Sequence, residues 1–271
     1  MLINGLKVLV ITFVLFNATS SYALSISGSE FPPFVQKNAD GKIAGPFFQM
    51  IKDVCQEMKE PCQFSLLPNQ RLKHMVNTGK VDAGFAYGWN TDRAKYLYYS
   101  VPFMLTEYGF FVPASNDKQI DGPKDFQGYT VGVSGPKSNM SYTLHKIRDK
   151  MISDNLKPIE IFENEDNNGK LIRMVELNRI NAYFANKSAG YSAASKVGAT
   201  QFRYAWQYKQ LLYFVVFHKK YTDKETVRKF NQAALRVFEH KGYLENKLSP
   251  WKISVPPLDE KTLQKYNVIY K

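Results

Sequence analysis

The chain has 271 residues, of which 44% are hydrophobic and 14% aromatic, and its formal net charge is +12. This composition excludes a disordered chain and can fill one large hydrophobic core or two ordinary ones. Lys and Arg are scattered along the sequence and form neither an arm nor a helical stripe. The charge therefore indicates a solvated basic surface and no nucleic-acid partner.

Residues 1–23 have the three parts of a secretory signal peptide. Lys7 belongs to a short basic start, residues 8–16 form an apolar run, and residues 21–23 give a small-x-small cleavage site. A bilayer span needs about 20 apolar residues, which neither this run nor any later segment reaches. We therefore expect cleavage near Leu24 and a periplasmic mature chain that has no membrane span.

Three short apolar segments predict the strands of a first unit: residues 24–27, 63–67 and 81–86. Helical patterns fill both gaps, and this alternation predicts parallel strands joined by right-handed crossovers. Ligands of such sheets bind at the carboxyl ends of the strands. Phe31, Asn69 and the segment 87–93 would therefore lie together at one edge of the sheet.

Cys55 and Cys62 both lie in the exported part of the chain, and an even number of cysteines there predicts a disulfide. Apolar residues recur at helical spacing over 47–58, and Pro61 ends that helix before the next strand. A bridge would join the end of the helix to the start of the strand. A metal site or catalytic thiol lacks support, because no cluster of ligand-type residues has suitable spacing.

Arg93 follows a turn cluster, residues 88–92, at the end of the third strand. In that position its fork of N–H donors can be held toward a carboxylate or a phosphate. The alternative is a surface arginine that pairs with Asp92 or solvent, which is the more common situation for this residue type.

The alternation of strands and helices repeats in the second half of the chain. Strands are predicted at three segments: residues 130–133, 158–162 and 180–184. Residues 212–217 are apolar enough to return to the first unit as a core strand, and Thr222-Asp-Lys-Glu225 predicts a capping box that starts a long helix. The expected α/β fold has two lobes, each a mainly parallel sheet flanked by helices, with two connectors and a ligand cleft between them. The expected limits are 24–113 with 211–271 for lobe 1, and 114–210 for lobe 2.

Several motifs occur in a characteristic order: Glu30-Phe-Pro-Pro-Phe34, Gly79-Lys-Val-Asp-Ala83, Tyr99-Ser-Val-Pro-Phe103 and Asp125-Phe-Gln-Gly128. In this order the chain resembles periplasmic solute-binding proteins of the polar-amino-acid ABC transporter type, such as the histidine and lysine/arginine/ornithine binders. The resemblance implies the type II two-lobed fold and a monomer without a cofactor. It also implies a small polar or anionic ligand, an amino acid or related organic acid, and a membrane ABC permease as partner. It places Arg93 on the ligand carboxylate and Phe31 where a ring stacks on the ligand.

The departures from the family pattern concern the ligand. Asn186 stands where the resemblance implies an Asp that binds the ligand ammonium group, so an α-amino group would need another carboxylate. Four acids could provide that carboxylate, namely Glu30, Glu163, Glu165 and Asp166. Arg71 either supplies a second cationic contact, which would favour an anionic ligand, or is a solvated helix residue. The full set of predicted ligand contacts is Phe31, Asn69, Arg71, Tyr87, Trp89, Arg93, Ser138 and Asn186.

No enzyme motif emerges from the sequence. The four histidines are dispersed and have no acidic partner at ligand spacing, which argues against a metal site. We therefore expect binding without catalysis. Two alternatives stay open on the same fold. A cyclohexadienyl dehydratase-like enzyme would need an acid or base with a shifted pKa in the cleft, and a signalling role would make the chain the ligand-binding partner of a receptor.

Overall fold

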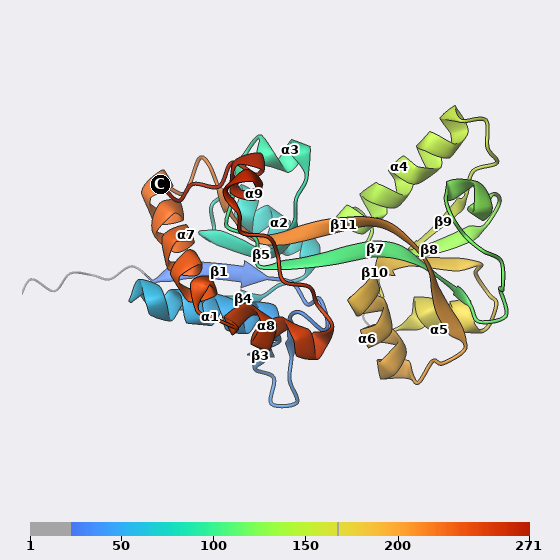
Figure 1. Ribbon diagram of the computed structural model, residues 1–271, viewed down its shortest axis with the longest axis horizontal. Coiled ribbons are helices and arrows are strands. Elements are labelled where there is room, and N and C mark those ends of the chain that lie inside the picture. Colours follow the sequence, from blue (N-terminus) through green and yellow to red (C-terminus); the bar gives the residue numbers. More distant parts are fainter. Residues whose placement is uncertain (1–22, 167) are drawn as a thin grey trace, which may run out of the picture.

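The computed structural model describes residues 23–166 and 168–271, so most of the predicted signal peptide lies outside the described residues. It confirms the predicted two-lobed α/β fold (Figure 1). Two long strands, β7 (Met104–Pro113) and β11 (Phe202–His218), run side by side through the middle of the molecule and connect the lobes. The predicted lobe limit after residue 113 falls at the end of β7, and the limit after residue 210 falls inside β11. None of the helices in the described residues has the length and apolar composition to cross a bilayer.

The first lobe contains the predicted parallel strands. β1 (Leu24–Gly28) lies between β4 (Cys62–Leu66) and β5 (Ala83–Gly88) and is parallel to both. β5 then pairs with β11 in the antiparallel direction, as does the short β6 (Leu97–Tyr99). The carboxyl ends of β1, β4 and β5 therefore face the second lobe, which places the loops that follow them at the boundary between the lobes.

Helices cover both faces of the first-lobe sheet (Figure 1). One face packs against α1 (Pro46–Met58), α7 (Lys224–Glu239) and α8 (Tyr243–Leu248), and the other against α2 (Asn69–Asn77) and Tyr266, the residue after α9 (Glu260–Lys265). Three short elements complete the lobe: β2 (Gln36–Lys37), β3 (Ile43–Ala44) and α3 (Thr91–Ala94). β2 and β3 form a hairpin on either side of the turn at Asp40 and Gly41.

The second lobe repeats the arrangement. β8 (Thr130–Ser134) lies between β9 (Glu160–Asn164) and β10 (Ala182–Asn186) and is parallel to both, while β10 pairs with β7 in the antiparallel direction. Its helices are η1 (Pro123–Phe126), α4 (Asn139–Ser153), α5 (Lys170–Glu176) and α6 (Lys187–Val197). The β8–α4 and β10–α6 junctions therefore lie at the carboxyl edge of this sheet.

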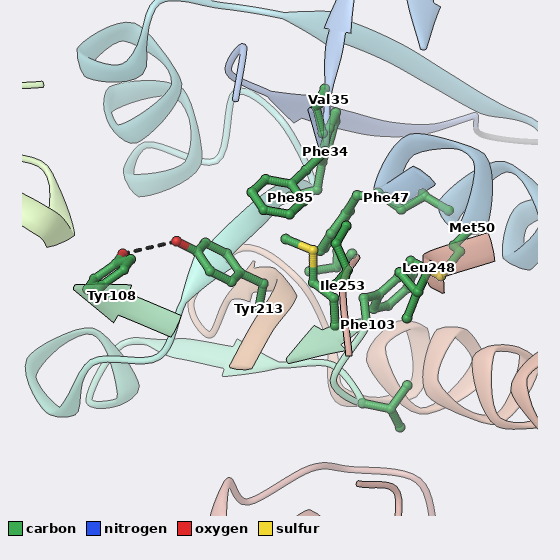
Figure 2. Close-up of a cluster of buried hydrophobic side chains, with 14 of the residues drawn as sticks. Phe34, Val35, Phe47, Met50, Phe85, Phe103, Tyr108, Tyr213, Leu248 and Ile253 are labelled. Atoms are coloured by element: carbon green, nitrogen blue, oxygen red, sulfur yellow. Dashed lines mark hydrogen bonds between the residues drawn. The ribbon is translucent and has the colours of Figure 1, made fainter. Parts of the chain in front are cut away.

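An aromatic cluster forms the core of the first lobe (Figure 2). The fully buried ring of Phe103 has its centroid 5.0 Å from that of Phe47 on α1 and 4.9 Å from that of Phe238 on α7. Phe103 therefore joins the two helices that cover this face of the sheet.

The predicted disulfide is present. Cys55, in the last turn of α1, is bonded to Cys62, the first residue of β4, at a sequence separation of 7. The bridge closes the turn between a helix and the strand that follows it, as the sequence predicted.

The start of α7 differs from the prediction by one residue. Thr222 does not cap the helix, because its hydroxyl donates to the carbonyl of Asp82 at 3.1 Å. Asp223 is the cap instead. Its carboxylate accepts hydrogen bonds of 2.8 Å from the N–H and from the hydroxyl of Thr226. The Asp-x-x-Thr arrangement uses both carboxylate oxygens, which a threonine cap cannot match.

Asp223→Ala is expected to lower the free energy of unfolding by about 0.5–2 kcal/mol at neutral pH. The N–H and hydroxyl of Thr226 hold the pKa of Asp223 below its ordinary value. A carboxyl whose pKa is lower when folded stabilises the protein above the unfolded pKa of about 4, and this contribution disappears as the pH falls through the folded pKa. Urea unfolding at neutral pH and near pH 3 measures the difference between wild type and variant. The difference in unfolding free energy caused by Asp223→Ala should be smaller near pH 3 than at neutral pH. The difference caused by Thr222→Val should be the same at both pH values.

Candidate ligand-binding cleft

A cleft with a volume of about 790 Å³ lies between the lobes. The first lobe lines it with the loops after β1 and β4, the start of α2 and the end of β5. The second lobe contributes the loop before α4 and one face of α6, and β7 and β11 supply the floor. These are the carboxyl ends of the parallel strands in both lobes, where the alternation of strands and helices predicted the site.

Two tyrosines form the floor of the cleft. The hydroxyls of Tyr108 on β7 and Tyr213 on β11 are 3.0 Å apart (Figure 2), and both residues line the cleft. The ring of Phe31 is 5.5 Å from that of Tyr213 and 4.7 Å from that of Phe34. Burial raises the pKa of Tyr213 well above its ordinary value, so both hydroxyls stay protonated at neutral pH. The floor therefore offers rings and neutral hydroxyls to a ligand.

Arg93 lies in the wall of the cleft. It is half-buried, and its guanidinium carbon is 5.5 Å from the centre of the Tyr87 ring. The side chain of Asn90 caps α3 by accepting hydrogen bonds from the N–H groups of Asp92 and Arg93, at 2.9 and 3.2 Å. Asp92 pairs with Lys95 at 2.8 Å, so the alternative in which Arg93 pairs with Asp92 is wrong. Across residues 23–166 and 168–271, no carboxylate lies at ion-pair distance from Arg93.

Lys73 is a second cation in the cleft wall, and the sequence interpretation missed it. It lies on α2 four residues after Asn69, so both side chains are on the helix face that lines the cleft. Arg71 is exposed and is not among the lining residues. The amine of Lys73 donates to the carbonyl of Lys137 across the cleft at 2.6 Å. Burial, and after it the charge of Arg93, lowers the pKa of Lys73.

The carboxylates of the cleft differ in how far they are engaged. Asp166 accepts hydrogen bonds from backbone N–H groups around the start of α5, those of Asn168, Lys170 and Leu171. Glu30 and Glu165 line the cleft but are exposed to solvent. Glu163 is not a lining residue. Its carboxylate accepts a hydrogen bond from the hydroxyl of Ser141, which is the main reason that its pKa is lowered, and it lies 2.9 Å from Nε2 of His145.

The second lobe presents the beginning of α4 to the cleft. Ser138 is its N-cap, accepting a hydrogen bond of 3.0 Å from the N–H of Ser141 and donating one of 3.1 Å to the carbonyl of Ser134. Gly135 adopts a φ of 72°, which turns the chain between β8 and the helix. The first N–H groups of a helix have no partner inside the helix, so this end can accept a negatively charged group.

The structure divides the predicted contacts into two groups. Five of them line the cleft: Phe31, Asn69, Tyr87, Arg93 and Ser138. Arg71, Trp89 and Asn186 are not lining residues. The ring of Trp89 packs 5.6 Å from that of Tyr266. Asn186 is fully buried; its amide donates to Thr106 at 2.8 Å and accepts from the N–H of Ala189 at 3.3 Å as the cap of α6. Its predicted place beside the ligand is therefore corrected to a structural one behind the floor.

The described cleft residues offer few groups for metal binding or catalysis. No group of three or more His, Cys, Asp or Glu residues in the described part of the chain could hold a metal ion. The lining residues include no histidine, and the tyrosine hydroxyls are protonated. The arrangement suits binding of a polar molecule by cations, hydroxyls and aromatic rings.

The model of the family described as bacterial extracellular solute-binding proteins, family 3, matches residues 25–252. A comparison with curated proteins gives no match.

Solved structures share the fold. A histidine kinase sensor domain with similarity to periplasmic binding proteins has a TM-score of 0.74 at 15% identity, covering 86% of this chain and 98% of its own. The substrate-binding protein of an amino acid ABC transporter has a TM-score of 0.67 at 13% identity, with coverages of 85% and 99%. An ancestral amino-acid-binding protein, a precursor of cyclohexadienyl dehydratase, has a TM-score of 0.68 at 17% identity, with coverages of 84% and 94%.

Proposed function

The chain belongs to the bacterial extracellular solute-binding proteins, family 3, and from this premise we propose that it captures a small anionic organic solute in the periplasm. The proposed partner is a membrane ABC permease, which receives the solute. One observation carries the choice of an anionic ligand. Arg93 lies half-buried in the cleft wall, and the described residues give it no carboxylate partner. A desolvated guanidinium without a counter-charge is costly, and a ligand carboxylate removes that cost.

Capture would proceed by closure of the two lobes around the ligand. Arg93 and the Phe31 ring hold the ligand on the first lobe, and Ser138 with the first turn of α4 covers it from the second. Only the closed arrangement satisfies both sets of contacts, so a ligand that makes both shifts the population toward closure.

Direct contacts between the lobes already bridge the cleft. The amide of Gln70 donates to the carbonyl of Pro136 at 3.1 Å, and the amine of Lys73 donates to that of Lys137 at 2.6 Å. Both donors are on α2 and both acceptors are in the loop before α4. These contacts support closure as a motion that brings α2 against that loop, with the long strands β7 and β11 as the connection.

The proposal includes binding without turnover. A catalytic base in the cleft would need a free, poised group. Asp166 is engaged with the backbone, the floor tyrosines are protonated, and Lys73, whose pKa is lowered, donates to the carbonyl of Lys137. Glu30 and Glu165 are exposed to solvent.

A thermal-shift screen of the mature protein against organic acids and amino acids tests the proposal. A ligand at 100 times its Kd adds about 2.7 kcal/mol to the stability of the folded state, which gives a clear rise in Tm. We expect anionic organic solutes to give the largest rises. A screen in which no carboxylate raises Tm would refute solute capture, and conversion of a prephenate-like acid at a rate proportional to protein would replace it with catalysis.

A further inference from the structure

The charged side chains that line the cleft differ in how far they are exposed to solvent. Three charged lining side chains are half-buried: Lys73, Arg93 and Asp166. The others are exposed to solvent: Glu30, Lys37, Glu165 and Lys196. Exposed charges are screened by water and salt, so they compensate a buried charge weakly. The electrostatic character of the interior therefore depends on the three half-buried groups.

Among these three, only the acid has its partners. The carboxylate of Asp166 is satisfied by backbone N–H groups around the start of α5, where the positive end of the helix also favours it. Lys73 has the neutral carbonyl of Lys137 and a coulombic interaction with the solvent-exposed Glu165, and Arg93 has the face of the Tyr87 ring. The first lobe thus presents two cations from two different elements, α2 and α3, to one cavity.

We propose that Lys73 is a specificity-determining residue and that the natural ligand carries two carboxylates, one for Arg93 and one for Lys73, and no ammonium group. This inference rests on the proposed function and adds the substrate class. A dicarboxylic acid supplies one negative charge for each half-buried cation. An ammonium group would enter a wall that already holds two positive charges. Among the described lining residues, the acids other than Asp166 are Glu30 and Glu165, which are solvent-exposed, and Glu165 already interacts electrostatically with Lys73.

The floor fits the same ligand. The hydroxyls of Tyr108 and Tyr213 share one hydrogen bond, and each also bonds to an asparagine side chain, Asn139 for Tyr108 and Asn186 for Tyr213, so the floor presents a neutral hydrogen-bonded network beside the two cations. The first turn of α4 offers further N–H donors from the second lobe.

Lys73 also has a structural role, which the test must separate from ligand recognition. Its bond to the carbonyl of Lys137 helps to hold the lobes together, and loss of that bond would weaken every ligand to a similar extent. Loss of the contact with a carboxylate would instead weaken dicarboxylates selectively. The ratio of the dicarboxylate affinity to the monocarboxylate affinity therefore shows whether Lys73 recognises the ligand or only joins the lobes. Gln70→Leu removes the neighbouring contact between the lobes and should weaken both kinds of ligand to a similar extent.

The experiment measures Kd by calorimetry for succinate, glutarate and adipate, each against the monocarboxylate of equal chain length, and for glutamate. Wild type should prefer the best dicarboxylate to its monocarboxylate by about 10- to 100-fold, the usual range for one charged hydrogen bond. Lys73→Gln should abolish most of that preference, and Lys73→Arg should retain it. Arg71→Gln, on the same helix but outside the cleft, should leave it unchanged. Circular dichroism establishes that each variant is folded.

Other outcomes contradict the inference. Tighter binding of glutamate than of glutarate would show that an ammonium group is accommodated. A preference that survives Lys73→Gln would remove Lys73 from ligand recognition. In both cases the proposed function stands as long as binding depends on Arg93. If no carboxylate binds at all, the proposed function and this inference fail together.

Discussion

Arg93→Ala is expected to weaken binding of the best anionic ligand by about 2–5 kcal/mol while the protein stays folded, the usual loss when one partner of a buried charged pair is removed. The side chain is half-buried in the cleft wall, over the Tyr87 ring and without a carboxylate partner in the described chain. No ion pair within the described part of the protein is broken by the substitution, so its cost should fall on binding and not on folding.

Arg71→Ala is the matched control, because it removes the same side chain from an exposed position outside the cleft. Calorimetric titration of both variants with the ligand that gives the largest thermal shift measures the effect. Chemical unfolding of the two variants without ligand should give similar free energies. If Arg93→Ala bound this ligand as tightly as wild type does, Arg93 would be an ordinary surface arginine, and the proposed site would fall with it.

The general organisation could be predicted because it depends on local patterns. Alternating strands and helices predicted that β1, β4 and β5 are parallel, and the turn between Cys55 and Cys62 predicted the disulfide. β11 was underestimated. Its apolar end, 212–217, was recognised, but no strand was predicted over 202–211, where most side chains are only half-buried. Its pairing with β7 over most of its length is a tertiary contact that composition does not report.

Helical phase explains why the second cation of the cleft was misassigned. Arg71 was left open between a cationic ligand contact and a solvated helix residue, and its exposed position supports the second. On α2 the residue that shares a face with Asn69 is four positions on, at Lys73. This could have been found from the sequence once Asn69 was placed at the cleft. The position of Asn186 could not. Whether the last residue of a strand points into a cleft or caps the next helix depends on the register of β10 against β7.

Phe103→Ala is expected to have the opposite effect, lowering the free energy of unfolding by about 3–5 kcal/mol, as for other buried phenylalanines truncated to alanine, while leaving ligand affinity unchanged. The Phe103 ring is fully buried and packs against Phe47 of α1 (Figure 2). It also packs against the α7 residues Phe230 and Phe238. Two helices and the sheet enclose the resulting cavity, so the neighbouring side chains can fill it only in part. Phe103 does not line the cleft.

Phe48→Ala provides the comparison, because this ring is on the same helix as Phe47 but is only half-buried, 5.1 Å from that of Phe64. It should cost clearly less, since the hydrophobic contribution follows the apolar area removed from water. Urea unfolding of both variants, together with titration of the folded protein below its transition, separates stability from binding. Equal losses of unfolding free energy in Phe103→Ala and Phe48→Ala would show that the aromatic cluster is not the stabilising centre of the first lobe. A weaker affinity in folded Phe103→Ala would show that core packing also sets the geometry around Arg93, so that the core and the cleft are coupled.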